Sequence, residues 1–597
     1  MKKLLIALLG SVTLLSCNDD YLDQVPDDRL TFEDTFNNET NVTRYLANVY
    51  SQIPGEYAQR YTTTQNSGPW TGGSDEGEYV WGFHMGNWLN IGDWNSTTQE
   101  VSNLWSNFYR GIRSASTFIA NVDKCADCSP TDIIQYKAEA RAVRAYYYYN
   151  LMRSWGPIIL LGETPIPQDA DLNALGLKRN SIEEVAQYIV SEMDQAIIGL
   201  EQGNFEDKDA GRFKVPMAMM IQEKTLLFAA SPLFNGNTDY AGFSDAEGNQ
   251  LIPQTYDVQK WKAAADVAKE FIDKFVPTQF SLYKDPTGNP YLSVRDVMIK
   301  DYNDEIIYAR PRGDIFYHYD ITPYHLGADG CYRGAGGLGV TQEAVDAFFT
   351  SNGRSIDDPV ANYDADGFSD FQAPYDFTTR STYNPWTNRE PRFYNAVTYN
   401  GSLWLNRGGG DIITKTWYGG NSGRQAGTND YAPTGYVVRK SYPVGQCQGF
   451  NQRSIPMFRL AELYLDYAEA LNEYDPGNPD ILKYVNLIRE RAGIPEYGTI
   501  DLAAPKDQGD MRIAIRKERR VELFGENVRY FDVRRWKIAS DVLDGPFHSM
   551  DINATSEADF YNVVVFENRI FRPQDYLWPI PQDEINANPT LTQNPGW

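Results

Sequence analysis

A succession of alanine-rich segments with helical periodicity places the strongest constraint on how this chain can fold. In the segment that Trp155 closes, Ala138, Ala142 and Ala145 would let a neighbouring helix approach closely. Helical periodicity covers residues 41–53, 98–122, 130–155, 181–200, 215–230, 259–275, 459–473 and 480–492. We therefore expect a mainly α fold with a tetratricopeptide-like scaffold of helix pairs, although the 34-residue consensus of that repeat is not clean here.

The N-terminus has the layout of a secretory signal. Lys2 and Lys3 precede an apolar run at 4–15, which is shorter than the ~20 residues that span a bilayer as a helix. The run ends in Leu-Leu-Ser-Cys, which resembles a bacterial lipobox. In that interpretation residues 1–16 are removed and Cys17 is lipidated, and its acyl chains hold the protein to a membrane. The alternative is an ordinary cleaved signal followed by a chance cysteine.

The residues after Cys17 are polar and acidic. Asn18-Asp19-Asp20 resembles the surface-export signal of lipoproteins in Bacteroidetes-type bacteria, and residues 18–30 suit a tether between membrane and domain. No second apolar run is long enough to cross a membrane. We therefore expect an extracytoplasmic protein that is tethered by its N-terminus.

Charge and composition exclude some functions. The chain has 80 acidic and 54 basic residues, a net charge of -26, which would repel phosphate backbones and makes nucleic acid an unsuitable partner. Only 4 histidines weaken hypotheses of a metal site or a histidine base. The aromatic content is the informative feature of the composition, with 40 tyrosines, 28 phenylalanines and 13 tryptophans. Aromatic faces stack on sugar rings as well as on one another in cores.

An aromatic loop at 66–95 interrupts the helical pattern. It is rich in Gly and Asn, and we select Asp75, Trp81, Trp88 and Trp94 as candidate ligand-binding residues. The other interpretation, given equal weight, is an ordered loop that its own tryptophans fix to the core.

A second irregular region, 310–450, is rich in Gly, Asn, Tyr and Pro, and long irregular stretches often carry function. Tyr317 and Tyr324 are its weaker ligand-binding candidates. We expect His318 and His325 to have surface or packing roles, because no paired carboxylate spacing supports a metal site.

Four cysteines remain after Cys17, and sequence alone cannot choose among the three pairings of Cys125, Cys128, Cys331 and Cys447. For the C-x-x-C pair Cys125 and Cys128, a local disulfide or two free thiols is favoured over a redox or zinc site. The acidic run 364–370 resembles a calcium loop but lacks the closing glutamate, so we expect a simple turn.

The segment 515–537 is rich in arginine, which could indicate anion binding. Acidic residues alternate with the arginines, however, so we expect arginine–carboxylate pairs within the fold.

Several blocks together resemble the SusD/RagB-type outer-membrane lipoproteins. They are residues 139–149, 229–236, 389–393, the arginine-rich helix that ends Phe-Asp-Val-Arg-Arg-Trp at 531–536, the Leu-Trp-Pro-Ile-Pro of 577–581, and the terminal 588–589 and 593–597. With Cys17 they cover essentially the whole chain in the expected order. One departure, Phe-Gly-Glu-Asn-Val at 524–528, touches a structural helix.

The resemblance implies a surface-exposed protein that is lipid-anchored in the outer membrane and binds without catalysis. It would capture oligosaccharides and deliver them to a SusC-like TonB-dependent transporter, with no cofactor and no metal. A peptide-capturing RagB-like binder is the alternative, and a glycoside hydrolase, which needs two carboxylates across a cleft, is a third hypothesis.

The same resemblance divides the chain into five parts. Residues 1–16 would be the signal and 17–30 the lipidated tether. An N-terminal helical region would cover 31–310, a loop-rich insertion 311–450, and a C-terminal helical region 451–597.

Overall fold

The fold is known from a computed structural model, which describes residues 32–61, 66–167, 176–205, 209–311, 315–324, 334–407, 410–442 and 454–597. The predicted lipidation of Cys17 lies outside the described residues, as do His325, Cys331 and Cys447.

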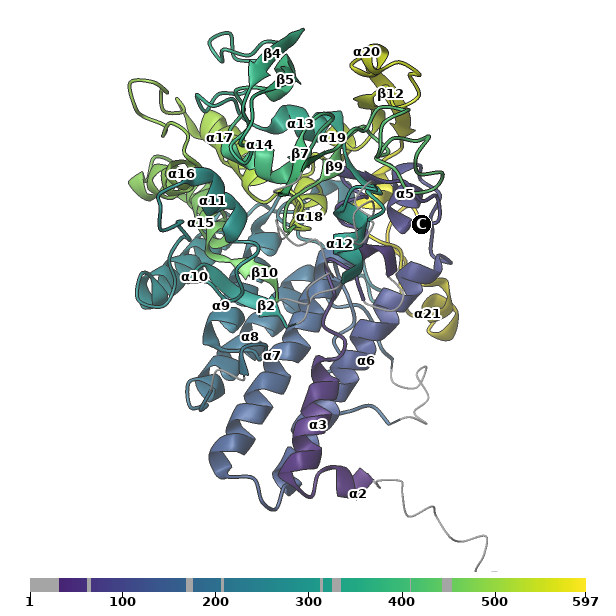
Figure 1. The fold of residues 1–597 in the computed structure, drawn as a ribbon. Helices are drawn as coiled ribbons and strands as arrows, with labels where there is room; N and C mark the ends of the chain where they lie inside the picture. The colour runs from purple at the N-terminus through teal and green to yellow at the C-terminus, as the bar shows by residue number, and fades with distance from the viewer. Residues whose placement is uncertain are drawn as a thin grey trace, which may run out of the picture.

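Long helices dominate the described chain (Figure 1). They are α3 (Glu39–Tyr50), α6 (Gln99–Asn121), α7 (Pro130–Trp155), α8 (Ile182–Leu200), α9 (Val215–Ala230), α10 (Gln259–Phe275), α15 (Leu460–Tyr474), α16 (Pro479–Ala492) and α17 (Gln508–Glu522). Shorter helices are α2 (Phe32–Thr35), α5 (Met85–Asn90), α11 (Pro290–Asp296), α12 (Ile315–Ile321), α13 (Gln342–Ala347), α14 (Pro391–Ala396), α18 (Arg529–Arg535), α19 (Ala539–Val542), α20 (Glu557–Phe560) and α21 (Gln582–Ala587). The predicted mainly α fold is confirmed.

Helices that follow one another along the chain pack side by side. The contacts run from α6 to α7, α8, α9 and α10 in turn, and α10 then packs on α15, which also contacts α16 and α17. The helical segments from the two ends of the chain therefore form one continuous scaffold, and the loop-rich elements gather at the end of the molecule away from α2 and the tip of α3 (Figure 1).

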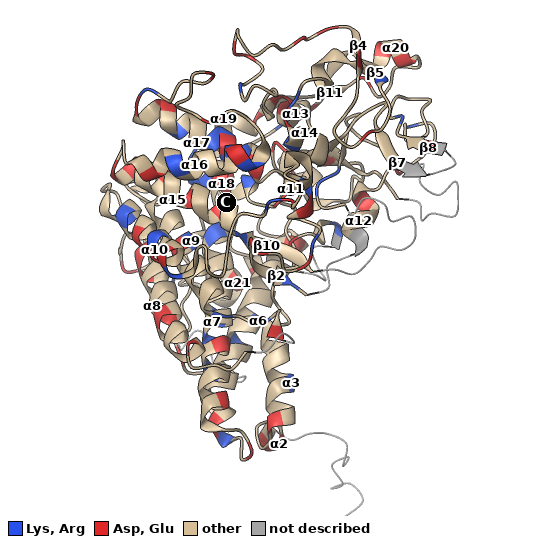
Figure 2. Ribbon diagram, turned by 60° about the vertical axis from the view of Figure 1, so that its left-hand side comes forward, with Lys and Arg blue, Asp and Glu red and all other residues tan. Residues whose placement is uncertain are grey.

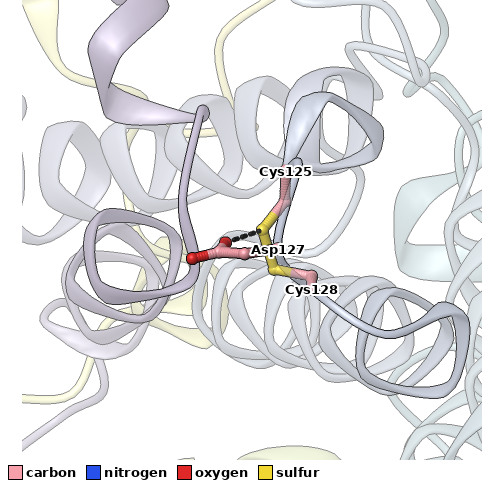
Figure 3. A group of neighbouring side chains, drawn as sticks. All are labelled: Cys125, Asp127 and Cys128. Atoms are coloured by element: carbon pink, nitrogen blue, oxygen red, sulfur yellow. Dashed lines mark hydrogen bonds between the residues drawn. A yellow bond between two sulfur atoms is a disulfide. The ribbon is translucent and has the colours of Figure 1, made fainter.

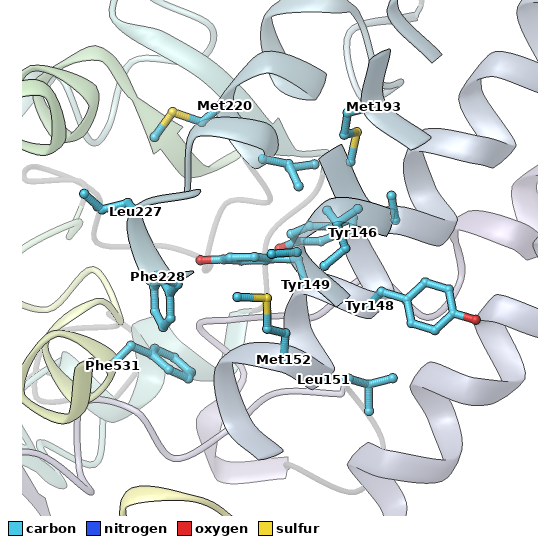
Figure 4. Close-up of a cluster of buried hydrophobic side chains, with 14 of the residues drawn as sticks. Tyr146, Tyr148, Tyr149, Leu151, Met152, Met193, Met220, Leu227, Phe228 and Phe531 are labelled. Atoms are coloured by element: carbon cyan, nitrogen blue, oxygen red, sulfur yellow. The ribbon is translucent and has the colours of Figure 1, made fainter. Parts of the chain in front are cut away.

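Helix α7 lies at the centre of this scaffold. Its start is fixed by a capping box in which the Ser129 side chain accepts from the amide of Asp132 and the Asp132 side chain accepts in return. Four consecutive tyrosines, Tyr146 to Tyr149, are all buried, so the helix is covered on every side there. Tyr149 meets Phe228 of α9 edge to face, with 5.9 Å between ring centroids, and Phe531 of α18 lies beside Phe228 (Figure 4).

Strands are short and form antiparallel pairs. The pairs are β1 (Gly77–Tyr79) with β3 (Leu338–Val340), β2 (Ile306–Arg310) with β10 (Ile455–Arg459), β4 (Phe368–Phe371) with β5 (Arg380–Tyr383), β6 (Val397–Thr398) with β9 (Val437–Val438), β7 (Leu403–Arg407) with β8 (Gly410–Ile413), and β11 (Gly545–Met550) with β12 (Val563–Arg569). Most of these pairs include at least one strand from residues 310–450, the region that we expected to be irregular.

Most arginines of α17 and α18 pair with carboxylates, as predicted, whereas Arg534 donates to the carbonyls of Tyr576 and Ser154. Arg519 donates to Asp532 at 2.6 Å and also pairs with Asp466, while both terminal nitrogens of Arg535 donate to Glu469. Figure 2 shows basic and acidic residues side by side on these helices. The segment is therefore a buried ion-pair network that joins α15, α17 and α18.

Cys125 and Cys128 form a disulfide in the turn between α6 and α7 (Figure 3). Asp127 within this turn accepts from the amide of Glu39 at 2.7 Å, which fastens the turn to the start of α3. Within the described residues, Cys125, Asp127 and Cys128 are the only group close enough to share a metal ion, and the two sulfurs already bond to each other. Of the two alternatives left open, a local disulfide or two free thiols, the structure has the disulfide.

Among the helices that the structure describes, none combines the length and the apolar composition needed to cross a bilayer.

Candidate functional site

The aromatic loop is held at its base by a short pair of strands. β1 pairs with β3 from Gly77 opposite Val340 to Tyr79 opposite Leu338, and beyond the strand the amide of Val80 donates to the carbonyl of Gly337 at 2.9 Å. Because of this pairing, Trp81 lies directly beyond the end of β1, beside Gly337. A Cβ at Gly337 would lie 2.5 Å from the Trp81 ring, so only glycine lets the indole rest on this backbone.

Asp75, a predicted ligand residue, is buried and fully engaged by arginines. Arg529 donates to its two carboxylate oxygens at 2.8 Å each, and Arg520 pairs with it at 2.8 Å. Burial alone would raise the pKa of Asp75, but these guanidiniums outweigh burial and hold it well below its usual value. The prediction that Asp75 faces a ligand is therefore corrected, because the carboxylate has no surface left to offer.

Two further carboxylates lie in the same buried layer. Burial, with the neighbouring Asp75 charge, raises the pKa of Glu76 to about 8, and burial raises that of Glu78 to about 8. Arg569 of β12 donates to Glu78 at 2.8 Å and to the carbonyl of Ser74 at 2.7 Å. The base of the loop is thus joined to the C-terminal part of the chain by arginines.

Trp94 also belongs to the core. It is 3% exposed, and its ring centroid lies 4.6 Å from that of Trp597 and 5.5 Å from that of Trp578. Trp70 is likewise buried against Phe531. The prediction of Trp94 as a stacking residue is therefore corrected, and the alternative interpretation of an ordered loop fixed by its own tryptophans holds for this part.

Trp81 lies at the centre of a mixed aromatic and charged cluster. The guanidinium carbon of Arg60 lies 3.5 Å from the centroid of one indole face, and the indole nitrogen donates to Asp430 at 3.1 Å. Tyr319 also faces Arg60, at 5.3 Å, and its hydroxyl donates to Asp430 at 3.4 Å. Arg60 further pairs with Asp320 at 2.6 Å, so the cation that stacks on Trp81 is itself held in place.

Phe83 forms the open edge of this cluster. Its ring is nearly parallel to Trp81, with 22° between the planes and 6.3 Å between centroids, and the side chain is 61% exposed. Trp88 is half-buried, and its indole nitrogen donates to the carbonyl of Gly82 at 3.0 Å, which steadies the turn that presents Phe83. A large exposed ring on a fixed turn is a suitable surface for stacking.

His84, which follows Phe83, is buried and held by three contacts. Its ring stacks on Tyr79 at 3.7 Å, it accepts from the amide of Gly86 through Nδ1, and Nε2 faces the carbonyl of Gln59 at 2.9 Å. Burial lowers the pKa of His84 to about 3, so the ring is neutral at physiological pH.

The two candidates from the second irregular region have different positions. Tyr317 is buried and meets Tyr57 edge to face at 4.9 Å, so the prediction of a ligand contact there is corrected. Tyr324 is half-buried and borders the turn that leads to Asp430, since a Cβ at Gly427 would lie 3.1 Å from its ring. His318 is buried and packs against Tyr442.

The structure thus leaves Trp88 and Tyr324 half-buried and places Asp75, Trp94 and Tyr317 in the interior. Trp81 is also buried, with 9% of its surface exposed, and it lies behind the exposed ring of Phe83. Sequence reasoning missed Arg60, Phe83, Tyr319 and Asp430. Phe83 stands next to Gly82 in the selected loop and could have been found by counting all aromatic residues there. Asp430 had no local signal, because it reaches Trp81 only through the tertiary fold.

Comparisons with known proteins agree along most of the chain. A family model described as "SusD family" matches residues 305–597, and one described as "Starch-binding associating with outer membrane" matches residues 20–206. A SusD-like protein of Bacteroides ovatus is 22% identical over 623 residues, which cover 99% of this chain and 97% of that protein.

Solved structures show the same fold. A SusD-like protein from Bacteroides fragilis has a TM-score of 0.73 and 22% identity, and the match covers 94% of this chain and 98% of that one. A laminarin-binding SusD-like protein has a TM-score of 0.55 and 19% identity, and the match covers 94% of this chain and all of that one, 100%. With two family models, a full-length relative and a shared helical fold, this chain is a member of the SusD-like family.

Proposed function

We propose that this protein is a cell-surface lipoprotein that captures oligosaccharides and delivers them to a SusC-like TonB-dependent transporter. The observation that carries the proposal is the exposed Phe83 ring beside Trp81, with the Asp430 carboxylate at the same cluster. The name of one family model, which mentions starch binding and the outer membrane, and the laminarin binding of one structural neighbour support the choice of ligand.

The arrangement suits a sugar because its parts are already in place. A pyranose stacks its C–H face on Phe83, and the neighbouring carboxylate accepts from its hydroxyl groups. Arg60, Asp320 and Tyr319 hold Trp81 and Asp430 without a ligand, so little conformational freedom is lost on binding.

The test is retardation of the full-length protein in native gels that contain laminarin or starch. Phe83→Ala should weaken retention about fivefold, because one ring contact of ~1 kcal/mol is lost. Phe377→Ala is the matched control, since this ring is 76% exposed and makes no ring contact within the described residues. Equal retention of both variants would remove Phe83 from the site.

Peptide capture and catalysis are outcomes of the same experiment. Retention that basic peptides abolish, with no response to any polysaccharide, would indicate a peptide binder. New reducing ends after incubation of the glycan with purified protein would indicate a hydrolase.

The anchor and the partner are tested separately. Cys17→Ser should release the protein from the membrane fraction and abolish incorporation of labelled palmitate, because the thiol carries the proposed lipid. Copurification of a TonB-dependent transporter with the wild-type protein would support delivery, and its absence would argue for an independent binder.

A further inference from the structure

A second aromatic cluster lies on the loop-rich end of the molecule and shares no residue with the Trp81 site. We call it the Phe368 platform and define it by Phe368 of β4, Tyr383 of β5, Trp386 and Tyr561, which follows α20. β4, β5 and α20 lie at the end of the molecule away from the tip of α3 (Figures 1 and 2).

The rings of the platform support one another. Phe368 meets Tyr561 at a right angle, with 4.8 Å between centroids, and Tyr383 at 5.6 Å. Tyr383 and Tyr561 are 4.9 Å apart, and the buried Trp386 lies behind both, at 5.2 Å and 5.7 Å. The outer ring of Phe368 therefore packs on two tyrosine rings, which Trp386 supports from behind, and has a defined position.

Phe368 nevertheless keeps 51% of its surface exposed. Phe377 on the same hairpin is 76% exposed, so exposure alone does not mark a site, and what distinguishes Phe368 is the rings on which it packs. The exposed ring on a rigid aromatic base indicates a contact surface.

Polar groups surround the platform in fixed positions. Asn384 donates to a carboxylate oxygen of Asp364 at 2.7 Å and to the carbonyl of Asp366, which shapes the turn before β4. The Asp366 carboxylate lies close enough to Tyr383 to act on its pKa, and it accepts no hydrogen bond from the described part of the chain. On the other side Asn400 donates to the hydroxyl of Tyr561 at 2.8 Å.

We propose that the Phe368 platform is a second saccharide-binding surface that takes neutral sugar units. A sugar stacks on Phe368 while its hydroxyls donate to Asp366, and the nearby Asp364 and Asp370 disfavour uronate or sulfate groups by charge repulsion. The acidic run 364–370, which forms a turn into β4, thereby supplies hydrogen-bond acceptors. The choice of ligand class rests on the proposed function.

Two surfaces on one chain would hold a polysaccharide at two points. The second contact then occurs at a high effective concentration, so a long chain is retained more strongly than a short oligosaccharide that reaches only one surface. The Phe368 platform should therefore affect polymers more than short ligands.

The experiment compares retardation of the full-length protein in native gels containing laminarin, starch or the anionic polymer alginate. The variants are Phe368→Ala, Asp366→Asn, Phe83→Ala, the double variant Phe83→Ala with Phe368→Ala, and the control Phe377→Ala, which lies on the same β4–β5 hairpin. A melting curve for each variant confirms folding.

Phe368→Ala should weaken retention by the neutral polymer about three- to tenfold, leave binding of a short oligosaccharide unchanged, and add to the loss caused by Phe83→Ala. Asp366→Asn should weaken the same retention less. Phe377→Ala should match the wild type, and alginate should retain no variant.

Wild-type retention of Phe368→Ala, together with a loss in Phe83→Ala, would overturn this proposal and leave the proposed function standing. A loss in Phe368→Ala with none in Phe83→Ala would support the platform and contradict the Trp81 site. A wild-type protein that no polysaccharide retains would overturn both. A Phe368→Ala protein that keeps glycan binding but no longer copurifies with the transporter would assign the platform to protein docking and overturn the proposal.

Discussion

The base and the tip of the aromatic loop use the same residue types in opposite ways. At the base, Trp94 is enclosed by Trp578 and Trp597, and Asp75 is enclosed by Arg520 and Arg529. At the tip, Trp81 is supported by Arg60 and Asp430, and one ring, Phe83, stays open.

This contrast shows how one loop can be fixed at its base and still expose a ring at its tip. The base contributes stability through burial and ion pairs, and this lets the tip expose an apolar ring without becoming mobile. Changes at the base should therefore unfold or loosen the protein, while changes at the tip should alter binding alone. Four predictions test this division.

Trp94→Ala should have the largest effect. Removing a fully packed indole leaves a cavity among other rings, and the free energy of unfolding should fall by about 4 kcal/mol. Chemical denaturation followed by circular dichroism measures the change. Trp88→Ala is the control, since that side chain is half-buried and should cost clearly less. Equal losses would erase the distinction between base and tip.

Asp75→Asn should follow, with a loss of about 3 kcal/mol, because it leaves two guanidiniums facing a neutral amide in a buried site. Asp366→Asn changes an exposed aspartate in the same way and should alter stability by less than ~0.5 kcal/mol. If Asp75→Asn were as stable as the wild type, the ion pairs would not be what fastens the loop.

Glu76→Gln should stabilise the protein at alkaline pH. The folded-state pKa is raised from 4.5 to about 8, so between these values the folded protein holds a proton that the unfolded chain has lost. The free energy of unfolding of the wild type therefore falls as pH rises through this window. The stabilisation that comes from the raised pKa of Glu76 is fully present only below pH 4.5.

The glutamine variant carries no such titration. It should show a flatter pH profile and a gain on the order of 2 kcal/mol at pH 8. Denaturation midpoints from pH 4 to pH 9 measure both slopes, and parallel profiles for the two proteins would show that Glu76 is charged in the folded state.

Phe83→Ala should have the smallest effect on stability, within ~0.5 kcal/mol, because the ring is largely in solvent. Its effect should appear in glycan retention. A large drop in melting temperature would instead show that the tip contributes to the core and would contradict the comparison.

The helices were predictable because their signals are local. The segments 215–230 and 259–275 match α9 and α10 to the residue, and the segment 130–155 matches α7. Apolar periodicity, caps and prolines act within a few residues, so they can be read without a partner. The arginine–carboxylate pairing was also predictable, since alternating charges need to neutralise each other when buried.

The candidate binding face was predictable only in part. The loop selected at 66–95 contains the exposed Phe83 and the half-buried Trp88, but Asp75, Trp81 and Trp94 are buried against partners that are remote in sequence. Arg529 reaches Asp75 across 454 residues of sequence, and Asp430 reaches Trp81 across 349.

Packed helices, an acidic composition, an aromatic loop and the blocks of the family could all be recognised from the chain alone. Which rings are enclosed and which are open depends on the folded molecule, because burial depends on what distant segments bring to the same place. That is why Trp94 stabilises the interior, while Phe83 and Phe368 face the solvent.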